Sequence, residues 1–227
     1  EGFAAVTLVL LTAGAWEWAR LCGLSSLPAL GSAMLCATLC LLSAWAGWTT
    51  RAPLAVWLLS GAGWVVGGAF LLRAGVPAWG RWPRAWRWLA GLLALWVAWL
   101  AIVQARRVGI NFLLSVLTLV WMADIAAYFA GRAFGGRFTR QRLAPSISPG
   151  KSWEGVWGGL AGVLLLATAW VLADRALAVD APSLHSQMFA RASWLMPIGA
   201  VFLCAMSVVG DLVESLIKRS AGVKDSS

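Results

Sequence analysis

The sequence predicts an all-α, polytopic integral membrane protein with about seven transmembrane helices. Of its 227 residues, 61% are hydrophobic and only 12% are charged, whereas soluble domains carry about 25% charged residues. Several windows of about 20 residues contain almost no charge, and this is the length that a helix needs to cross a bilayer. Many of the 17 tryptophans lie near the ends of these windows, where indole rings favour the membrane interface.

Seven apolar segments divide the chain, and we expect them to form a single transmembrane domain over residues 1–227. The first carries Glu17 and Arg20 near its end, and the second and third contain no charged residue. The fourth is closed by Arg106 and Arg107, the fifth contains one aspartate, the sixth is rich in glycine, and the seventh ends in a polar tail. Their approximate ranges are 2–22, 28–48, 53–72, 88–104, 110–131, 153–173 and 194–217.

The net charge of +9 would suggest nucleic acid in a soluble protein. Here the basic residues cluster in loops, so membrane orientation and anionic headgroups explain them, and no nucleic-acid partner is expected. The loops after the third and fifth segments are strongly basic and are expected in the cytoplasm, while the neutral loop after the sixth is expected outside. In this scheme Arg106 and Arg107 fall on the outer side, against the rule that basic residues lie on the cytoplasmic side.

The sixth segment contains two small-xxx-small pairs, Gly155/Gly159 and Gly158/Gly162. This spacing permits close contact between helices, either within one chain or between subunits. A homodimer is therefore compatible with the sequence, and the pattern indicates packing more than chemistry.

Two acids lie near the ends of segments that are expected to face the cytoplasm. Asp124 precedes Gly131 by seven residues, and Asp211 precedes Lys218 by the same spacing, so each lies about 10 Å inside its helix end. A carboxylate at that depth is costly unless it is paired or bound to a cation. Two interpretations stay open: a structural ion pair with Arg or Lys, or a site in which acids with nearby Ser and Lys hold Mg²⁺ and phosphates.

The loop before the sixth segment is a second candidate. Its Gly-Lys-Ser sequence suggests a phosphate-binding loop, but Pro145 stands where that motif needs glycine, so the motif is excluded. A Pro/Gly-shaped turn then presents Ser148, Lys151 and Ser152 at a helix N-terminus, which suits an anion. Alternatively, Ser152 caps the helix and Glu154 complements its dipole, and both interpretations are compatible.

The closing helix and its tail form a third candidate. One face of this helix is polar and the other is apolar, so the polar face should meet a cavity or another helix. In the tail, Lys218, Arg219 and Lys224 surround Asp225. Such bases can simply touch lipid headgroups, but the interleaved acids and serines favour a more specific role. The only histidine, His185, lies in the outward loop and is given no role.

Three separated stretches carry specific motifs, and a looser one, Ala15-Trp16-Glu17-Trp18, lies near the start. They are Ala123-Asp124-x-x-Ala127-Tyr128-Phe129-x-Gly131-Arg132-x-Phe134-Gly135, then Leu143-x-Pro145-x-Ile147-Ser148-Pro149-Gly150-Lys151-Ser152-Trp153-Glu154-Gly155, and last Gly210-Asp211-Leu-x-Glu214-Ser215-Leu-Ile-Lys218-Arg219 followed by Lys224-Asp225. In this order they resemble the signature of the phosphatidate cytidylyltransferases (CDP-diacylglycerol synthases). The resemblance is dense over residues 121–227 and loose before them.

The resemblance implies a nucleotidyltransferase of phospholipid biosynthesis, which converts CTP and phosphatidic acid to CDP-diacylglycerol and pyrophosphate with Mg²⁺; a second cation stays open. It also implies a bacterial inner (plasma) membrane protein whose active site faces the cytoplasm. Carried over by position, the catalytic residues are Asp211 as the metal ligand, Lys218, Lys224 and Asp225. The substrate-binding residues are Ser148, Lys151, Ser215, Arg219 and Asp124.

In one respect the chain departs from the family pattern. The family signature continues into a Pro-Gly-His-Gly-Gly turn and an Asp-Arg-x-Asp run, whereas this sequence stops at Ser227 and lacks an initiator methionine. We therefore expect a fragment that is truncated at both ends, has an incomplete site and shows little or no activity alone.

Two other functions stay open. One is an ion-coupled transporter in which Asp124 and Asp211 bind the transported cation, although no internal repeat supports it. The other is a CTP-dependent enzyme that acts on an isoprenoid lipid.

Overall fold

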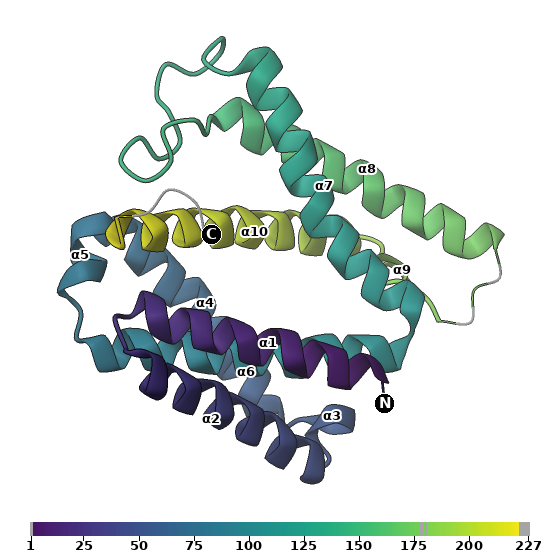
Figure 1. Ribbon diagram of the computed structural model, residues 1–227. Coiled ribbons are helices and arrows are strands. Elements are labelled where there is room, and N and C mark those ends of the chain that lie inside the picture. The colour runs from purple at the N-terminus through teal and green to yellow at the C-terminus, as the bar shows by residue number, and fades with distance from the viewer. Residues whose placement is uncertain (1, 178, 180, 223–227) are drawn as a thin grey trace. The chain divides into compact units, whose positions relative to one another are not determined.

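A computed structural model describes residues 2–177, 179 and 181–222, and the fold is all-helical over this part of the chain (Figure 1). Among the described residues, seven helices are long and apolar enough to cross a membrane, which confirms the predicted class of integral membrane protein. They are α1 (Gly2–Leu21), α2 (Ser26–Trp45), α4 (Leu54–Ala74), α6 (Arg84–Val108), α7 (Ile110–Phe134), α8 (Trp153–Ala176) and α10 (Leu195–Ser220). Three short helices connect them: α3 (Trp48–Arg51), α5 (Val76–Arg81) and α9 (Leu184–Arg191).

The contacts within the chain divide it into two compact units. The first comprises Glu1–Val66 and Arg81–Arg107, and the second comprises Gly67–Gly80 and Val108–Ser227. Each is described by itself below, and the single transmembrane domain expected from the sequence stays a prediction.

In the first unit, α1, α2 and α6 pack through tryptophans that also make hydrogen bonds. The indole of Trp88 donates to the hydroxyl of Ser32 at 2.9 Å, and the indole of Trp96 donates to Ser43 at 2.9 Å. Trp18 in turn donates to the backbone carbonyl of Trp88 at 3.1 Å. Polar groups in an apolar environment need such partners. The buried core between these helices consists of Ala15, Cys36, Cys40, Leu92, Trp99, Leu100 and Val103.

In the second unit, α7 and α8 form a closely packed helix pair, and α9 and α10 pack against it. The α9 segment is held by polar contacts: Asp174 accepts from the side chain of Asn111 and from the backbone of Ser183, both at 2.8 Å. His185 on α9 is fully buried. The buried core of this unit consists of Leu119, Ala123, Val163, Ala167, Met196, Ala200 and Cys204.

One helix begins earlier than the sequence predicts. Helix α6 starts at Arg84 rather than near Trp88, so Arg84 and Arg87 belong to the helix and not to the preceding loop. The helix starts directly after Pro83, whose carbonyl accepts hydrogen bonds from Trp86 and Arg87 at 3.1 and 3.3 Å. Charge marked this stretch as a loop, but arginine is a good helix former and does not end a helix.

Candidate functional site

Glycines bring α7 and α8 into backbone contact. A Cβ atom added at Gly159 would lie 2.8 Å from the carbonyl oxygen of Ala123, and one at Gly155 would lie 3.0 Å from that of Ala127. At Gly158 it would lie 2.1 Å from the Cβ of Ala130. The predicted close contact is therefore made within one chain. These glycines do not support the homodimer, which stays a prediction.

The loop before α8 is held in place by one buried carboxylate. Glu154 is 6% exposed, and its Oε1 accepts from the backbone of Phe138 at 3.0 Å and of Thr139 at 2.8 Å, and from the Thr139 hydroxyl at 2.9 Å. Ser152 caps the helix as expected, since its hydroxyl accepts from the backbone of Gly155 at 3.2 Å. Glu154 was expected only to complement the helix dipole; it also ties residues 138–139 to the start of α8.

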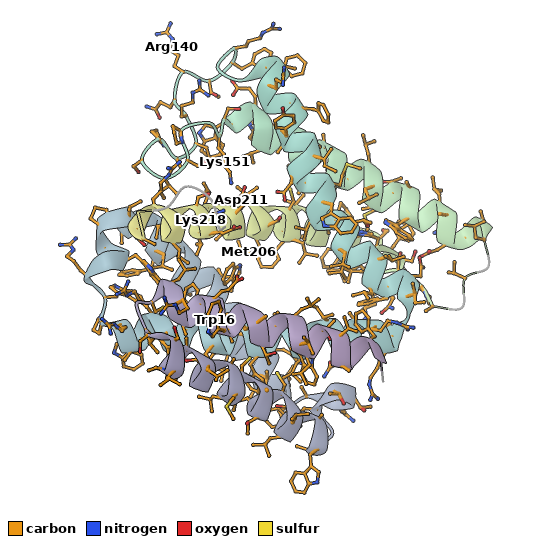
Figure 2. The ribbon with its side chains drawn as sticks, viewed as in Figure 1. Trp16, Arg140, Lys151, Met206, Asp211 and Lys218 are labelled. Atoms are coloured by element: carbon orange, nitrogen blue, oxygen red, sulfur yellow. The ribbon has the colours of Figure 1, made fainter. Side chains whose placement is uncertain are left out.

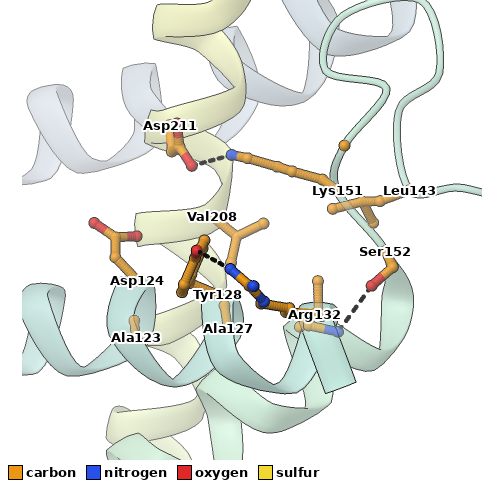
Figure 3. Close-up of a pocket in the computed structure, with 14 residues that line it drawn as sticks. Ala123, Asp124, Ala127, Tyr128, Arg132, Leu143, Lys151, Ser152, Val208 and Asp211 are labelled. Carbon is orange, nitrogen blue, oxygen red and sulfur yellow. Dashed lines mark hydrogen bonds and ion pairs between the residues drawn. The ribbon is translucent and has the colours of Figure 1, made fainter. Parts of the chain in front are cut away.

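A cavity of about 580 Å³ lies between α7, this loop, the start of α8 and α10 (Figure 3). Its wall is apolar for the most part, with a few polar side chains from three separate segments. This combination is typical of ligand pockets. The polar side chains are Asp124, Tyr128 and Arg132 from α7, Lys151 and Ser152 from the loop, and Asp211 from α10.

Two contacts order this polar lining. Lys151 forms an ion pair with Asp211 across the cavity, and the two side chains point toward one another in Figures 2 and 3. On α7, Arg132 donates to the hydroxyl of Tyr128 at 3.1 Å. Within the described part of the chain, the carboxylate of Asp124 makes no ion pair or hydrogen bond. The cavity thus holds one paired and one unpaired carboxylate.

The structure brings together four of the residues singled out from the sequence: Asp124, Lys151, Ser152 and Asp211 line the same cavity. Ser148 lies in the same loop but not in the cavity wall, and its backbone donates to Ala144 at 2.8 Å. The proximity of the two acids is as expected from their equal depth. For Asp211 the structure shows an ion pair, which was one of the two interpretations left open.

The remaining predicted residues lie further along α10 or beyond it. Lys218 pairs with Glu214 one turn earlier at 2.8 Å, and Figure 2 shows Lys218 closer than Asp211 to the end of the helix. Ser215, Lys218 and Arg219 are not in the cavity wall. Lys224 and Asp225 lie outside the described residues. The roles of all these residues stay predictions.

Two residues of the lining, Tyr128 and Arg132, were quoted within a motif but not predicted as site residues. A signal for them exists, because Asp124, Tyr128 and Arg132 follow one another at spacings of four and share one face of α7. Once Asp124 is placed in a cavity, this periodicity places the other two beside it.

The cavity suits a phosphate group together with a hard divalent cation. Mg²⁺ uses one or two carboxylates and completes its shell with water and phosphate oxygens, and Asp124 and Asp211 supply such a pair. No group of three or more His, Cys, Asp or Glu side chains that could hold a metal gathers anywhere among the described residues, so the cavity offers a pair of carboxylates. Lys151 and Arg132 provide positive charge for phosphate oxygens.

Fold and cavity together describe a polytopic membrane protein with a cavity lined by carboxylates and basic side chains. A family model described as the cytidylyltransferase family matches residues 2–227. The chain therefore belongs to the cytidylyltransferase family, which confirms the resemblance seen in its motifs.

Curated bacterial relatives agree with this assignment. The phosphatidate cytidylyltransferase of Pseudomonas aeruginosa is 38% identical over 228 residues, which cover 99% of this chain and 77% of the relative. That of Haemophilus influenzae is 46% identical over 119 residues, covering 52% of this chain and 37% of the relative. That of Brucella suis is 38% identical over 149 residues, covering 64% and 46%. No solved structure matches the chain.

Proposed function

We propose that the protein transfers a cytidylyl group from CTP to phosphatidic acid, giving CDP-diacylglycerol and pyrophosphate. The observation that carries the proposal is the cavity in which Asp124, Lys151 and Asp211 converge from three segments. Support also comes from the family and from relatives that are named phosphatidate cytidylyltransferase.

In the proposed reaction, an ionised phosphate oxygen of phosphatidic acid attacks the α-phosphorus of CTP. The new P–O bond forms as the bond to the β-phosphate oxygen breaks, and the electron pair leaves with pyrophosphate. Asp124 and Asp211 would hold Mg²⁺, which supplies a Lewis acid for the phosphate oxygens. Lys151 and Arg132 would bind the same oxygens and stabilise the charge that develops on them.

The ion pair between Lys151 and Asp211 gives this site two states. Without nucleotide, each side chain neutralises the other across the cavity. When triphosphate enters, the ammonium of Lys151 can pair with a phosphate oxygen, and the carboxylate of Asp211 becomes free for a cation. The ion pair therefore neutralises both charges in the mostly apolar cavity wall until substrate binds. A phosphate oxygen then takes the place of Asp211 beside Lys151, and a cation takes the place of Lys151 beside Asp211.

The protein also needs access to a lipid substrate and to a soluble nucleotide. We propose that it lies in the bacterial inner membrane with this cavity on the cytoplasmic side, so that CTP enters from water and phosphatidic acid from the bilayer. The basic loop after α7, with Arg137, Arg140 and Arg142, supports this orientation.

The test is formation of CDP-linked lipid from labelled CTP by the full-length protein, purified in detergent. Because Asp211 is proposed to hold the cation, we expect Asp211→Asn to lower turnover by about 10²-fold to 10³-fold, as for removal of one preorganised charge-stabilising group. Glu17→Gln on the exposed surface of α1 is a matched control and should retain turnover. Unchanged turnover in Asp211→Asn would remove the central assignment.

A second readout does not depend on turnover. Mn²⁺ can replace Mg²⁺ and can be followed by its paramagnetic signal, so its binding to the protein without substrate can be measured directly. We expect Lys151→Met to bind Mn²⁺ more tightly than the wild type, since the competing ammonium is gone, and Asp211→Asn to bind it more weakly. Equal affinities in all three proteins would argue against a cation at this carboxylate.

The same assay separates the alternative substrates. Labelled product should form with phosphatidic acid and not with an isoprenoid alcohol or isoprenyl phosphate. Product from the isoprenoid alone would instead support the other CTP-dependent enzyme, and cation transport without any CTP turnover would support the transporter.

A further inference from the structure

Three arginines of the first unit converge on the short turn between α1 and α2. Arg20, in the last turn of α1, donates to the carbonyl of Leu24 at 2.9 Å. The guanidinium of Arg84 lies 3.8 Å from the position that a Cβ on Gly23 would take. Burial raises the pKa of the neighbouring Cys22 thiol, while the charges of Arg87 and Arg84 act to lower it, so Arg87 lies close to the same turn.

These three positive charges have no carboxylate partner in the part of the chain that the structure describes. The ion pairs found there are Lys151–Asp211 and Lys218–Glu214, and both belong to the second unit. Glu17 lies one turn before Arg20 on α1 but is exposed and forms no ion pair. Three like charges around one turn repel each other, so a bound anion would stabilise this arrangement.

Arg87 provides an independent indication of a ligand. Its Nε is buried and has no hydrogen-bond acceptor among the described residues. Leaving a buried donor of a charged group without an acceptor is unfavourable, so we infer an acceptor that the described residues do not supply. A phosphate group fits, because it offers several oxygens and guanidinium groups bind it through paired hydrogen bonds.

The position of this cluster identifies the source of the phosphate. Trp88 is hydrogen-bonded to Ser32 and accepts from Trp18, so α6 is tied to α1 and α2 beside the turn. Trp16 and Trp86, which flank the cluster on α1 and α6, are 41% and 64% exposed. Exposed indoles at helix ends favour the level of the lipid headgroups, where the abundant phosphate is that of phospholipids.

We propose that Arg20, Arg84 and Arg87 bind the headgroup phosphate of an anionic phospholipid at the α1–α2 turn. None of these arginines lines the cavity of the second unit, and the proposal does not rest on the proposed function. Gly23 has a φ of +83°, a conformation that favours glycine. Without a side chain there, the backbone of the turn stays open beside the guanidinium of Arg84.

The test is titration of the detergent-purified protein with dioleoyl-phosphatidylglycerol, with bound lipid counted by native mass spectrometry. This lipid is neither substrate nor product of the proposed reaction, so failure here leaves that proposal intact. We expect Arg84→Gln/Arg87→Gln to bind it about 10-fold more weakly or worse, as for the loss of charge-assisted hydrogen bonds. Arg106→Gln/Arg107→Gln, at the other end of α6, removes the same charge and should bind as the wild type does.

Further measurements decide the source of the phosphate and protect the test against misfolding. Dioleoyl-phosphatidylcholine should bind more weakly than phosphatidylglycerol, and millimolar inorganic phosphate should not displace the lipid. Arg20→Gln, on the exposed end of α1, should also weaken binding even if the double variant fails to fold. Equal affinity for the two lipids, displacement by inorganic phosphate, or unchanged binding in a folded Arg84→Gln/Arg87→Gln variant would each overturn the proposal.

Discussion

The two units hold their helices together in different ways. In the second, α7 and α8 meet backbone to backbone, with Gly158 and Gly159 facing Ala130 and Ala123. In the first, α6 keeps its distance from α1 and α2, and the space is filled by indoles such as Trp88, which also find hydrogen-bond partners. Lipid tails are as apolar as leucine, so helices in a membrane need close contact or hydrogen bonds to associate.

The difference matches what each unit carries. Backbone contact fixes the position of α7 against α8, so Asp124 and Lys151 reach one cavity from different segments. Indole packing fills the space between α6 and its neighbours and places large rings near the helix ends, which suits a scaffold at the membrane interface. The cavity therefore lies in the unit whose helices pack closely through glycines. The indoles near the helix ends lie in the unit whose helices pack through bulky side chains.

The largest expected effect comes from filling the α7–α8 contact. Gly158→Leu should destabilise the protein by about 3 kcal/mol, the upper end for overpacking, because even a Cβ there would lie 2.1 Å from the Cβ of Ala130. Gly61→Leu on α4 is the matched control, since no atom lies within 4 Å of a Cβ at that position. Thermal unfolding in detergent measures the stability of both variants. If Gly158→Leu were as stable as Gly61→Leu, the close α7–α8 contact would not be needed for stability.

Next in size is the loss of the loop anchor. Glu154→Ala removes the acceptor of three hydrogen bonds from Phe138 and Thr139 and should favour loop opening by about 2 kcal/mol. Tryptic cleavage in the loop should then be about 30-fold faster. Glu154→Gln keeps an acceptor oxygen, so its loop should be cleaved at a rate between those of the wild type and Glu154→Ala. Cleavage of Glu154→Ala at the wild-type rate would show that the anchor is not needed.

A smaller effect concerns stability at acidic pH. The one histidine of the chain, His185, lies in the second unit. Burial lowers the pKa of His185 below its ordinary value of 6.5, although the backbone of Ser115 and the charge of Asp174 act to raise it. The unfolded chain therefore binds the proton more readily, so stability is complete above about pH 6.5 and falls below it, by at most about 1.4 kcal/mol per pH unit.

Hydrogen exchange measured between pH 7 and pH 5 tests this directly. Protection of α9 should fall with pH while protection of α2 in the first unit stays constant. His185→Leu should remove the pH dependence of α9, because it removes the imidazole that takes up the proton. An equal fall in both units would assign the effect to other groups.

The smallest effect sharpens the description of the indole contacts. Trp88→Phe and Ser32→Ala each remove one side of the 2.9 Å hydrogen bond. A double-mutant cycle should give a coupling of about 0.6 kcal/mol, the average for hydrogen bonds between membrane helices. A coupling near zero would mean that Trp88 acts by its ring area alone.

Much of this protein follows from its sequence. The seven spans were predicted because the absence of charge over about 20 residues is a local property. The equal depth of Asp124 and Asp211 follows from counting residues along a helix, and the cap at Ser152 from the residue that precedes α8. The start of α6 was misplaced because charge was taken to mark a loop.

Only the tertiary structure decided which polar groups meet. Three of these contacts join residues from different segments. They are the pairing of Lys151 with Asp211, the anchoring of the loop by Glu154 and the burial of His185. The convergence of Arg20, Arg84 and Arg87 on one turn does so too. Each depends on how far apart two helices lie and which faces they turn to each other. Spacing along one helix gives depth and face, but the partner across the gap is set by packing between helices, and glycines and indoles decide that distance.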